Sequence, residues 1–509
     1  SLKMIGVEKG DRIVGYTPNI PEAIIAMLAT TSIGAIWSSC SPDFGVKGVL
    51  DRFKQIKPKV IFVANGYQYN GKIFKTLKKT NKIIEKLPSI IKTIIINNIN
   101  SDDDISNISN GIFYNNFILN KPKPLKFEQL PFDHPIYIMY SSGTTGLPKS
   151  IVHSAGGTLI QHIKELKLHC NLKREDCIFY FTTCGWMMWN WLISSLTLGA
   201  SIFLYDGSPF YPNEYTLWKL ADKLKISIFG TSAKFLSSCE KNKIKPIKHS
   251  NLDSIKIILS TGSTLNDESY NYVYKNIKKD VLLGSISGGT DIISCFVISN
   301  PILPVYKGEI QCKGLGMDVK AFNENGKSVL NKKGELVCVS AFPSMPIYFW
   351  NDKNNKKYLK TYFSKYNNIW NHGDFIEFFN NGGLKIYGRS DATLNPGGVR
   401  IGTSEIYRIL EKLKFIEDSI IVGQNWEGDQ RVILFIKLPK NKKLNQKLIN
   451  KIKLNIKNNC SPRHVPSKII QVKGIPYTIN GKKVELAVKK IIQGEKVKNQ
   501  DSLENPKIL

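Results

Sequence analysis

Short apolar runs alternate with longer polar or amphipathic stretches along most of the chain. Runs of this length that are bounded by polar residues or glycine indicate buried strands. They lie at residues 12–16, 59–64, 93–96, 136–140, 202–205, 227–230 and 255–259. Because strands and helical stretches alternate, the pattern favours an α/β fold with largely parallel sheets.

Two of the stretches between these runs predict helices. Residues 23–37 form the longest apolar run and indicate a buried helix that follows Pro21, because proline is favoured in the first turn of a helix. Hydroxyl residues at 30–32 interrupt this run, so it falls short of the ~18 residues of a membrane helix. Residues 72–87 are basic and helix-like, whereas residues 97–110 are polar and predict a surface loop.

The pattern changes twice towards the C-terminus. Residues 310–390 are rich in short strands and turns and indicate a small β subdomain. After Arg389, short helices and strands indicate a compact α+β unit. The sequence therefore predicts a large N-terminal domain over residues 1–389 and a smaller C-terminal domain. Because a strand is expected directly after residue 10, we also expect the large domain to lack an N-terminal portion.

The composition excludes several classes of protein. With 42% hydrophobic and 22% charged residues, the chain is neither disordered nor a collagen-like or disulfide scaffold. Its nine cysteines are scattered without a C-x-x-C pair, which favours reduced thiols in the cytoplasm. His162, His169 and Cys170 do not have zinc-ligand spacing, and there is no G-x-S-x-G nucleophile elbow. No signal peptide pattern opens the sequence.

The net charge of +30 raises the alternative of a basic nucleic-acid-binding protein. The chain has 63 lysines and only 8 arginines, although specific readers of nucleic acid rely on arginine. Lysine, asparagine and isoleucine share AT-rich codons, so the charge is interpreted mainly as a coding bias. It is densest in residues 391–509, which hold 23 basic and 11 acidic residues.

The strongest motif is YSSGTTGLPK at residues 140–149, directly after an apolar strand. Glycines and small hydroxyl residues expose N–H and O–H groups to a phosphate chain, and Lys149 adds a positive charge. It is not a P-loop of the G-x-x-x-x-G-K-[ST] type, because two residues separate Gly146 from Lys149. The motif therefore predicts a different kind of phosphate-binding loop.

This loop resembles that of the acyl-adenylate-forming (AMP-binding) enzymes, and further motifs of that family follow in its order. They are SGGTD at 287–291, WNHGD at 370–374, GRSD at 388–391 with GGVRI at 397–401, and YTINGK at 477–482. The segment WSSCSPDFG at 37–45 is similar to short-chain acyl-CoA synthetases. The segments at 183–191, 204–209, 288–296 and 475–485 are similar to the acetoacetate–CoA ligases among them.

The resemblance implies a two-step ligation. Acetoacetate would attack the α-phosphate of ATP to give an acyl-adenylate and pyrophosphate, and the thiol of coenzyme A would then displace AMP. ATP, Mg²⁺ and coenzyme A are the implied cofactor and co-substrates, with small molecules rather than nucleic acid or membrane as partners. Another short acid, such as acetate or propionate, is the alternative substrate.

The resemblance also implies roles for particular residues. Lys482 would bridge the carboxylate and the α-phosphate, with Thr290 and Asp291 as further catalytic residues. Asp291 stands where the family has a glutamate, and it would bind Mg²⁺ directly or through water. The nucleotide would be held by Ser141, Ser142, Gly143, Thr144, Thr145, Gly146, Lys149, Gly262, Ser263, Thr264, Gly289, Asp374, Arg389 and Arg400.

The remaining roles concern the acyl group, coenzyme A and domain movement. Trp186, Met188 and Asn190 are predicted to line the acyl pocket, with Asn190 as a donor to the ketone of acetoacetate. Gly398 and Arg463 would contact coenzyme A. In this family the C-terminal domain is mobile, which here implies a hinge at residues 390–391 that includes Asp391, and a mobile α+β domain at 392–509 that carries Lys482.

Overall fold

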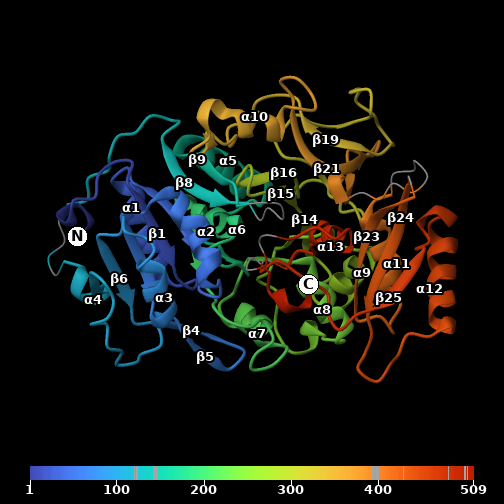
Figure 1. The fold of residues 1–509 in the computed structure, drawn as a ribbon, viewed down its shortest axis with the longest axis horizontal. Coiled ribbons are helices and arrows are strands. Elements are labelled where there is room, and N and C mark those ends of the chain that lie inside the picture. The colour runs from blue at the N-terminus through green and yellow to red at the C-terminus, as the bar shows by residue number, and fades with distance from the viewer. Residues whose placement is uncertain are drawn as a thin grey trace.

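The computed structural model describes residues 1–119, 121, 124–141, 147–392, 394, 396, 401–427, 429–479, 481–497, 500 and 503–509, with the backbone alone at Asp391, Asp429 and Arg463. Figure 1 shows two sheets and their helices in the blue, cyan and green parts of the chain, small sheets in the yellow part, and an orange and red C-terminal part. None of the helices in the described ranges is long and apolar enough to cross a membrane.

An eight-stranded sheet forms the first layer, with the order β20-β9-β8-β2-β1-β3-β6-β7. The strands from β8 to β7 are parallel, and β9 and β20 join them in antiparallel pairs. The strands are β1 (Arg12–Tyr16), β2 (Ile36–Cys40), β3 (Val60–Ala64), β6 (Lys92–Ile96), β7 (Gly111–Phe113), β8 (Pro135–Tyr140), β9 (Ser150–Ser154) and β20 (Tyr348–Phe349). The helices of this part are α1 (Pro21–Ser32), α2 (Val46–Ile56), α3 (Leu77–Ile84), α4 (Tyr114–Phe117) and α5 (Ala155–Lys164).

A second sheet of five strands is parallel throughout, in the order β11-β10-β12-β13-β14. These strands are β10 (Cys177–Tyr180), β11 (Ser201–Phe203), β12 (Ile228–Ser232), β13 (Ile257–Thr261) and β14 (Leu282–Ser285). Helices α6 (Met187–Ile193), α7 (Thr216–Lys223), α8 (Ala233–Lys241) and α9 (Asp267–Asn276) follow its strands along the chain. The predicted α/β fold with largely parallel sheets is therefore confirmed.

Small antiparallel sheets follow the second sheet. One contains β15 (Ser287–Gly289), β16 (Ser294–Ile298) and β17 (Cys312–Lys313). The other contains β18 (Val319–Phe322), β19 (Gly334–Cys338), β21 (Trp370–Phe378) and β22 (Leu384–Arg389), with α10 (Lys356–Tyr362) between β20 and β21. This four-stranded sheet is the β subdomain that the pattern of residues 310–390 predicted.

In its described residues, the C-terminal part combines three α-helices with a three-stranded sheet. Its elements are α11 (Thr403–Glu411), β23 (Asp418–Trp426), β24 (Asp429–Lys437), α12 (Gln446–Asn459), β25 (Lys468–Gln471) and α13 (Glu485–Ile492). It has an apolar core of its own, which includes Ile406, Leu410, Ile421, Leu434 and Ile452. The chain then returns toward α8, where the C-terminus lies near the centre of Figure 1. The predicted α+β character is confirmed, whereas the domain boundaries stay a prediction.

Two predicted helices are partly strands. The helix predicted at residues 23–37 ends at Ser32, and Trp37 lies in the buried strand β2. Gly34 has a φ of +73°, a left-handed conformation that ends helices readily. Lys72–Lys75 forms β5, which pairs with β4 (Gly66–Tyr69), because Asn70 and Gly71 both have positive φ angles and make a hairpin turn.

Candidate active site

A cavity of about 830 Å³ lies at the carboxyl ends of β13 and β14, where the crevices of parallel sheets usually bind ligands. One wall comes from the N-terminal part, including residues 261–266 and 285–291. The other wall comes from the C-terminal part, including Tyr407, Asp418 and the turn around Lys482. The cavity therefore brings together residues that are more than two hundred positions apart in the sequence.

Lys149 and Asp291 meet at one end of this cavity. The Nζ atom of Lys149 lies 3.0 Å from Oδ1 of Asp291, which also accepts a hydrogen bond of 2.5 Å from the hydroxyl of Tyr362. Burial by itself raises the pKa of the Asp291 carboxyl, but Lys149, His372 and the Tyr362 hydroxyl outweigh it and hold that pKa well below its usual range. Asp291 therefore carries a negative charge at neutral pH.

Among the described residues, Asp291 is the side chain that we consider as a ligand for a magnesium ion. No group of three or more His, Cys, Asp or Glu side chains that could hold a metal is found among them. Asp291 is nevertheless a carboxylate at the phosphate end of the cavity, and Mg²⁺ is usually bound by one or two carboxylates together with phosphate oxygens and water. Asp291 could thus supply one protein ligand to a magnesium ion that arrives with a nucleotide.

The predicted ribose contacts form a second group. Asp374 in β21 and Arg389 in β22 are opposite each other in the sheet, and Nη1 of Arg389 lies 3.4 Å from Oδ1 of Asp374. The same Nη1 donates to the carbonyl oxygen of His372 at 3.0 Å. Gly373 has a φ of +79°, a backbone conformation that residues with a side chain rarely adopt, so this position next to Asp374 favours glycine.

His372 lies directly behind this pair. It is buried against Phe296, with ring centroids 4.6 Å apart, and a Cβ on Gly289 would lie 3.5 Å from its ring. Burial lowers the pKa of His372, so its imidazole is neutral at physiological pH. Among the described residues, its Nδ1 atom has no hydrogen-bond partner.

Lys482 reaches the cavity from a tight turn of the C-terminal part. The backbone N–H of Thr478 donates to the carbonyl oxygen of Lys482 at 2.8 Å, and the N–H of Lys482 donates to the hydroxyl of Thr478 at 3.0 Å. Gly481 has a φ of +74°, which the turn requires. The side chain is accessible from the cavity, yet the surrounding protein desolvates the ammonium and lowers the pKa of Lys482, with Asp374 and Asp291 acting in the opposite direction.

The predicted adenine contacts follow β13. Gly262 has a φ of +93°, and its missing Cβ leaves space on the side of the Trp186 ring, which would be 4.0 Å away. Thr264 donates its hydroxyl to the carbonyl oxygen of Ile386 at 3.4 Å, which ties this segment to β22. Gly262, Ser263 and Thr264 all line the cavity.

The predicted acyl residues separate into two groups. Trp186 and Met188 line the cavity together with Ile286, Ser294 and Cys295. Asn190 is fully buried within α6 and is not among the residues that line the cavity. The predicted role of Asn190 toward the ketone of an acyl substrate stays a prediction.

The other predicted site residues are only partly covered by the described residues. Ser142, Gly143, Thr144, Thr145, Gly146, Gly398 and Arg400 lie outside the described residues, and only the backbone is described for Asp391 and Arg463. Ser141 and Thr290 line the cavity, and the carbonyl oxygen of Thr290 is 3.0 Å from Nε2 of His153. Sequence reasoning missed Tyr362, which belongs to no motif, and His372, which stands inside the WNHGD motif.

Comparisons with known proteins show the family of the chain. The AMP-binding enzyme family matches residues 1–349. The acetoacetyl-CoA synthetase of Gallus gallus is 53% identical, and the acetoacetyl-coenzyme A synthetase of Rhizobium meliloti (strain 1021) is 50% identical. Both matches cover 100% of this chain and 78% of the relative.

A solved structure extends the similarity to three dimensions. The acetoacetyl-CoA synthetase from Streptomyces lividans superimposes with a TM-score of 0.94 at 40% identity, covering 100% of this chain and 78% of that chain. Because the similarity holds for sequence and fold over the whole chain, this chain belongs to the AMP-binding enzyme family and is an AMP-forming acid–thiol ligase.

Proposed function

We propose that this chain ligates acetoacetate to coenzyme A at the expense of ATP, through an acetoacetyl-adenylate, with release of pyrophosphate and AMP. The observation that carries the proposal is the cavity that brings Lys482 together with Lys149, Asp291 and Asp374. Its whole-length similarity to acetoacetyl-CoA synthetases of Gallus gallus and Rhizobium meliloti supports acetoacetate as the acid.

In the first step, a carboxylate oxygen of the acid attacks the α-phosphorus of ATP, and the bond to the β-phosphate oxygen breaks. The reacting groups are all anionic, so cations placed at the reacting centre lower the barrier most. Lys482 is the cation that we assign to the carboxylate and α-phosphate, and Lys149 the one that we assign to the departing phosphates. A magnesium ion bound through Asp291 would neutralise further phosphate charge.

In the second step, the sulfur of coenzyme A attacks the acyl carbon, and the phosphate oxygen of AMP leaves with the bonding electrons. We assign Asp374 and Arg389 to the ribose, where the carboxylate can accept hydrogen bonds from two hydroxyl groups. The coenzyme A contact proposed for Gly398 and the hinge at residues 390–391 with Asp391 rest on motif position alone. The contact proposed for Arg463 rests on the positive charge of residues 391–509.

The cysteines support a reducing compartment for the enzyme. All nine are free thiols in the structure, and most are buried. Free thiols on this scale are typical of proteins kept in the cytoplasm. We therefore propose a cytoplasmic enzyme that acts on small molecules.

The decisive experiment is a panel of acids. Release of pyrophosphate is measured with acetoacetate, acetate, propionate and butyrate, each with ATP, Mg²⁺ and coenzyme A. We expect the highest kcat/KM with acetoacetate. A clear preference for acetate or propionate would replace acetoacetate by another short acid, and no pyrophosphate release with any acid would contradict the ligase activity itself.

A further inference from the structure

Helix α5 ends in a wider turn that carries a buried carboxylate. Residues Glu165–His169 form a π turn, in which the N–H of Cys170 donates to the carbonyl oxygen of Glu165 at 3.0 Å. The side chain of Glu165 has no solvent exposure at all. A fully buried carboxylate destabilises the folded protein unless both of its oxygens accept hydrogen bonds. The partners of Glu165 therefore have to be identified.

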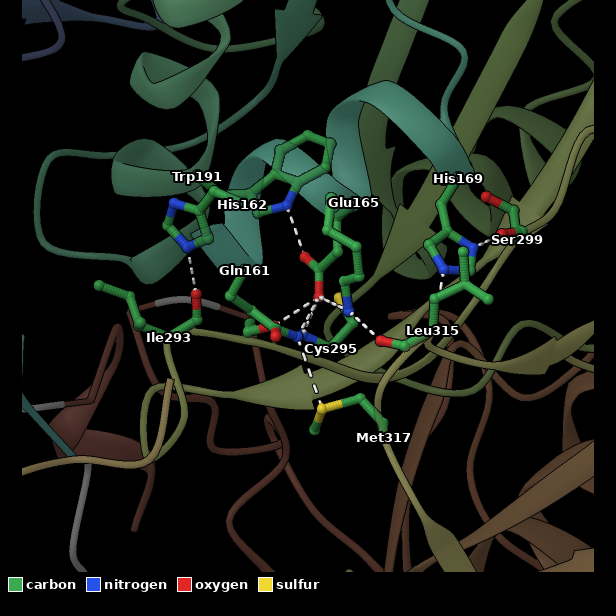
Figure 2. Close-up of polar contacts among 12 residues, drawn as sticks. Gln161, His162, Glu165, His169, Trp191, Ile293, Cys295, Ser299, Leu315 and Met317 are labelled. Atoms are coloured by element: carbon green, nitrogen blue, oxygen red, sulfur yellow. Dashed lines mark hydrogen bonds and ion pairs between the residues drawn. The ribbon is translucent and has the colours of Figure 1, made fainter. Parts of the chain in front are cut away.

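Both oxygens of Glu165 accept hydrogen bonds from N–H or O–H groups, and Nζ of Lys164 also lies 3.8 Å from Oε1. Oε2 accepts from the indole Nε1 of Trp191 at 2.8 Å. Oε1 accepts from the side-chain amide of Gln161 at 3.0 Å and from the backbone N–H of Cys295 at 3.2 Å. The hydroxyl of Ser294 approaches the same oxygen at 2.5 Å. Figure 2 shows these contacts converging on the carboxylate.

The network joins three elements that are distant in the sequence. Gln161 and Glu165 come from the end of α5, Trp191 from α6, and Ser294 with Cys295 from the start of β16. The amide of Gln161 also donates to the hydroxyl of Ser294 at 2.8 Å, so the hydroxyl proton of Ser294 is directed at Glu165. The geometry of the carboxylate therefore fixes the rotamers of Trp191 and Ser294 together.

A second residue of α5 supports the turn that precedes β16. Nε2 of His162 lies 2.5 Å from the carbonyl oxygen of Ile293, and its Nδ1 lies 2.9 Å from the hydroxyl of Ser194. Ile293 has a φ of +50°, which is a rare conformation for a β-branched residue. This turn also contains Thr290 and Asp291. The contact from His162 therefore supports the short segment that connects Asp291 to β16.

The network lies directly behind one end of the cavity. Ser294 and Cys295 contribute to the cavity wall, and Met188, three residues before Trp191 on α6, lines it as well. Glu165, Gln161 and Trp191 do not line it. A substrate in the cavity would thus meet Ser294 and Met188, whose positions depend on a carboxylate that the substrate does not touch.

We propose that Glu165 is a positioning residue for acyl selectivity, which fixes the wall formed by α6 and β16 at the acyl end of the cavity. The proposal rests on the proposed acyl-CoA ligase function. It assigns no contact between Glu165 and substrate. Its effect passes through Trp191, Ser294 and the backbone of Cys295, so a change at Glu165 should alter which acid fits rather than how ATP binds.

The test uses Glu165→Gln in the full chain. A glutamine keeps the shape but offers an NH₂ group to one set of donors, which leaves a buried N–H without an acceptor. The ratio of kcat/KM for acetoacetate to that for butyrate, an acid of equal length without the ketone, is measured by pyrophosphate release. We expect this ratio to fall by about tenfold, with the KM for ATP changed by less than about twofold.

His169→Asn provides a matched control. His169 stands in the same π turn and is fully buried, but it pairs with the carbonyl oxygen of Ser299 at 2.7 Å and the N–H of Leu315 at 3.0 Å, away from the cavity wall. This control should lower the thermal midpoint to a similar extent and leave the acid ratio unchanged. Trp191→Phe, which removes one donor to Glu165 and keeps an aromatic ring, should shift the ratio in the same direction as Glu165→Gln.

The outcomes separate the two proposals. Equal losses with both acids in Glu165→Gln and Trp191→Phe, or a changed ratio in His169→Asn, would overturn the positioning role. If Glu165→Gln does not fold, Trp191→Phe decides the question by the same ratio. If the wild type prefers another acid, acetoacetate as substrate is wrong, and the ratio is then taken between the preferred acid and butyrate.

Discussion

At the scale of single residues, the position of Lys482 is set by backbone contacts rather than by a charged partner. Its turn is closed through Thr478, and among the described residues no carboxylate lies within ion-pair distance of its ammonium. Desolvation lowers the pKa of Lys482. A cation without a carboxylate partner that faces the cavity interacts strongly with an anionic reacting centre, so it should matter most in the step that concentrates negative charge.

Substitution of Lys482 by Ala should therefore separate the two half-reactions. We expect adenylate formation to fall by about 10²–10³, since the removal of one preformed electrostatic contact has effects of this size. Thioester formation from preformed adenylate and coenzyme A should be nearly unchanged. Both steps are measured separately by rapid quench.

Lys473→Ala is the control for this experiment. Lys473 is an exposed lysine that precedes the same turn, and its loss should affect neither step. An equal loss of both half-reactions in Lys482→Ala would contradict the assigned role.

Site residues could be predicted from the sequence where they stand in a motif. Lys149, Asp291, Asp374 and Lys482 are brought to one cavity by the fold, as the order of their motifs indicated. Tyr362 and Glu165 could not be found in this way. A tyrosine at the end of an amphipathic helix, or a glutamate beside a lysine, is typical of a solvated surface, and only the tertiary contacts of these residues distinguish them.

At the scale of elements, helix α11 depends on a carboxylate at its first turn. Oε1 of Glu405 accepts from the N–H of Gly402 at 2.8 Å, and Oε2 lies 2.6 Å from Nζ of Lys333, which precedes β19. Burial alone would raise the pKa of Glu405, but His464, Lys333 and the Gly402 N–H together lower it to about 2, from 4.5. The charge on Glu405 therefore stabilises both the helix and its contact with the small β sheet.

Glu405→Gln should destabilise the protein in a pH-dependent manner. The folded-state pKa lies below the unfolded value of 4.5, so the contribution of the charge is complete above pH 4.5 and is lost as the pH falls toward 2. We expect a difference from the wild type of about 3 kcal/mol at pH 7. Thermal unfolding of both proteins between pH 3 and 7 measures it.

The exposed Glu427 provides the control, because Glu427→Gln should leave the thermal midpoint unchanged at every pH. A difference between Glu405→Gln and the wild type that did not narrow below pH 4.5 would contradict a role for the charge.

Whole elements were easier to predict than their limits. The parallel strands β1, β3, β6, β8, β11, β12 and β13 were recognised because buried strands are continuous apolar runs, whereas β2, β7, β10 and β14 were not predicted as strands. Trp37 was assigned to a helix, because an apolar run gives no periodicity with which to separate a buried helix from a buried strand. The strand Lys72–Lys75 was missed because all of its residues are exposed and it begins and ends with a lysine. Only the Asn70-Gly71 pair before it signals a hairpin.

At the scale of the whole molecule, a few polar contacts hold the C-terminal part against the N-terminal part. The side-chain amide of Asn266 donates to Glu411 at 2.6 Å, Lys412 lies 3.0 Å from Glu268, and Nζ of Lys241 donates to the carbonyl oxygen of Glu417 at 3.1 Å. Contacts of this type are individually weak and can be exchanged, as the predicted movement of the C-terminal domain would require. These contacts are present in the same arrangement of the two parts in which Lys482 faces the cavity.

Substitution of Glu411 by Ala should therefore weaken that arrangement. The loss of one hydrogen bond between charged and polar groups should reduce the rate of adenylate formation by about two- to tenfold, while the thioester step from preformed adenylate is preserved. Single-turnover measurements of each step check this. The exposed Glu427→Ala should change neither rate, and an unchanged adenylation rate in Glu411→Ala would show that this contact does not stabilise the adenylating arrangement.

The two walls of the cavity have a consequence for the stability of the C-terminal part. Because one wall includes residues 261–266 and 285–291 and the other includes Tyr407, Asp418 and Lys482, any molecule that touches both walls acts as a reversible cross-link between distant segments. Its binding free energy is then added to the cohesion between the two parts. The stability of the C-terminal part is in this sense not a fixed property of its sequence, because it rises and falls with the concentrations of the small molecules that occupy the cavity.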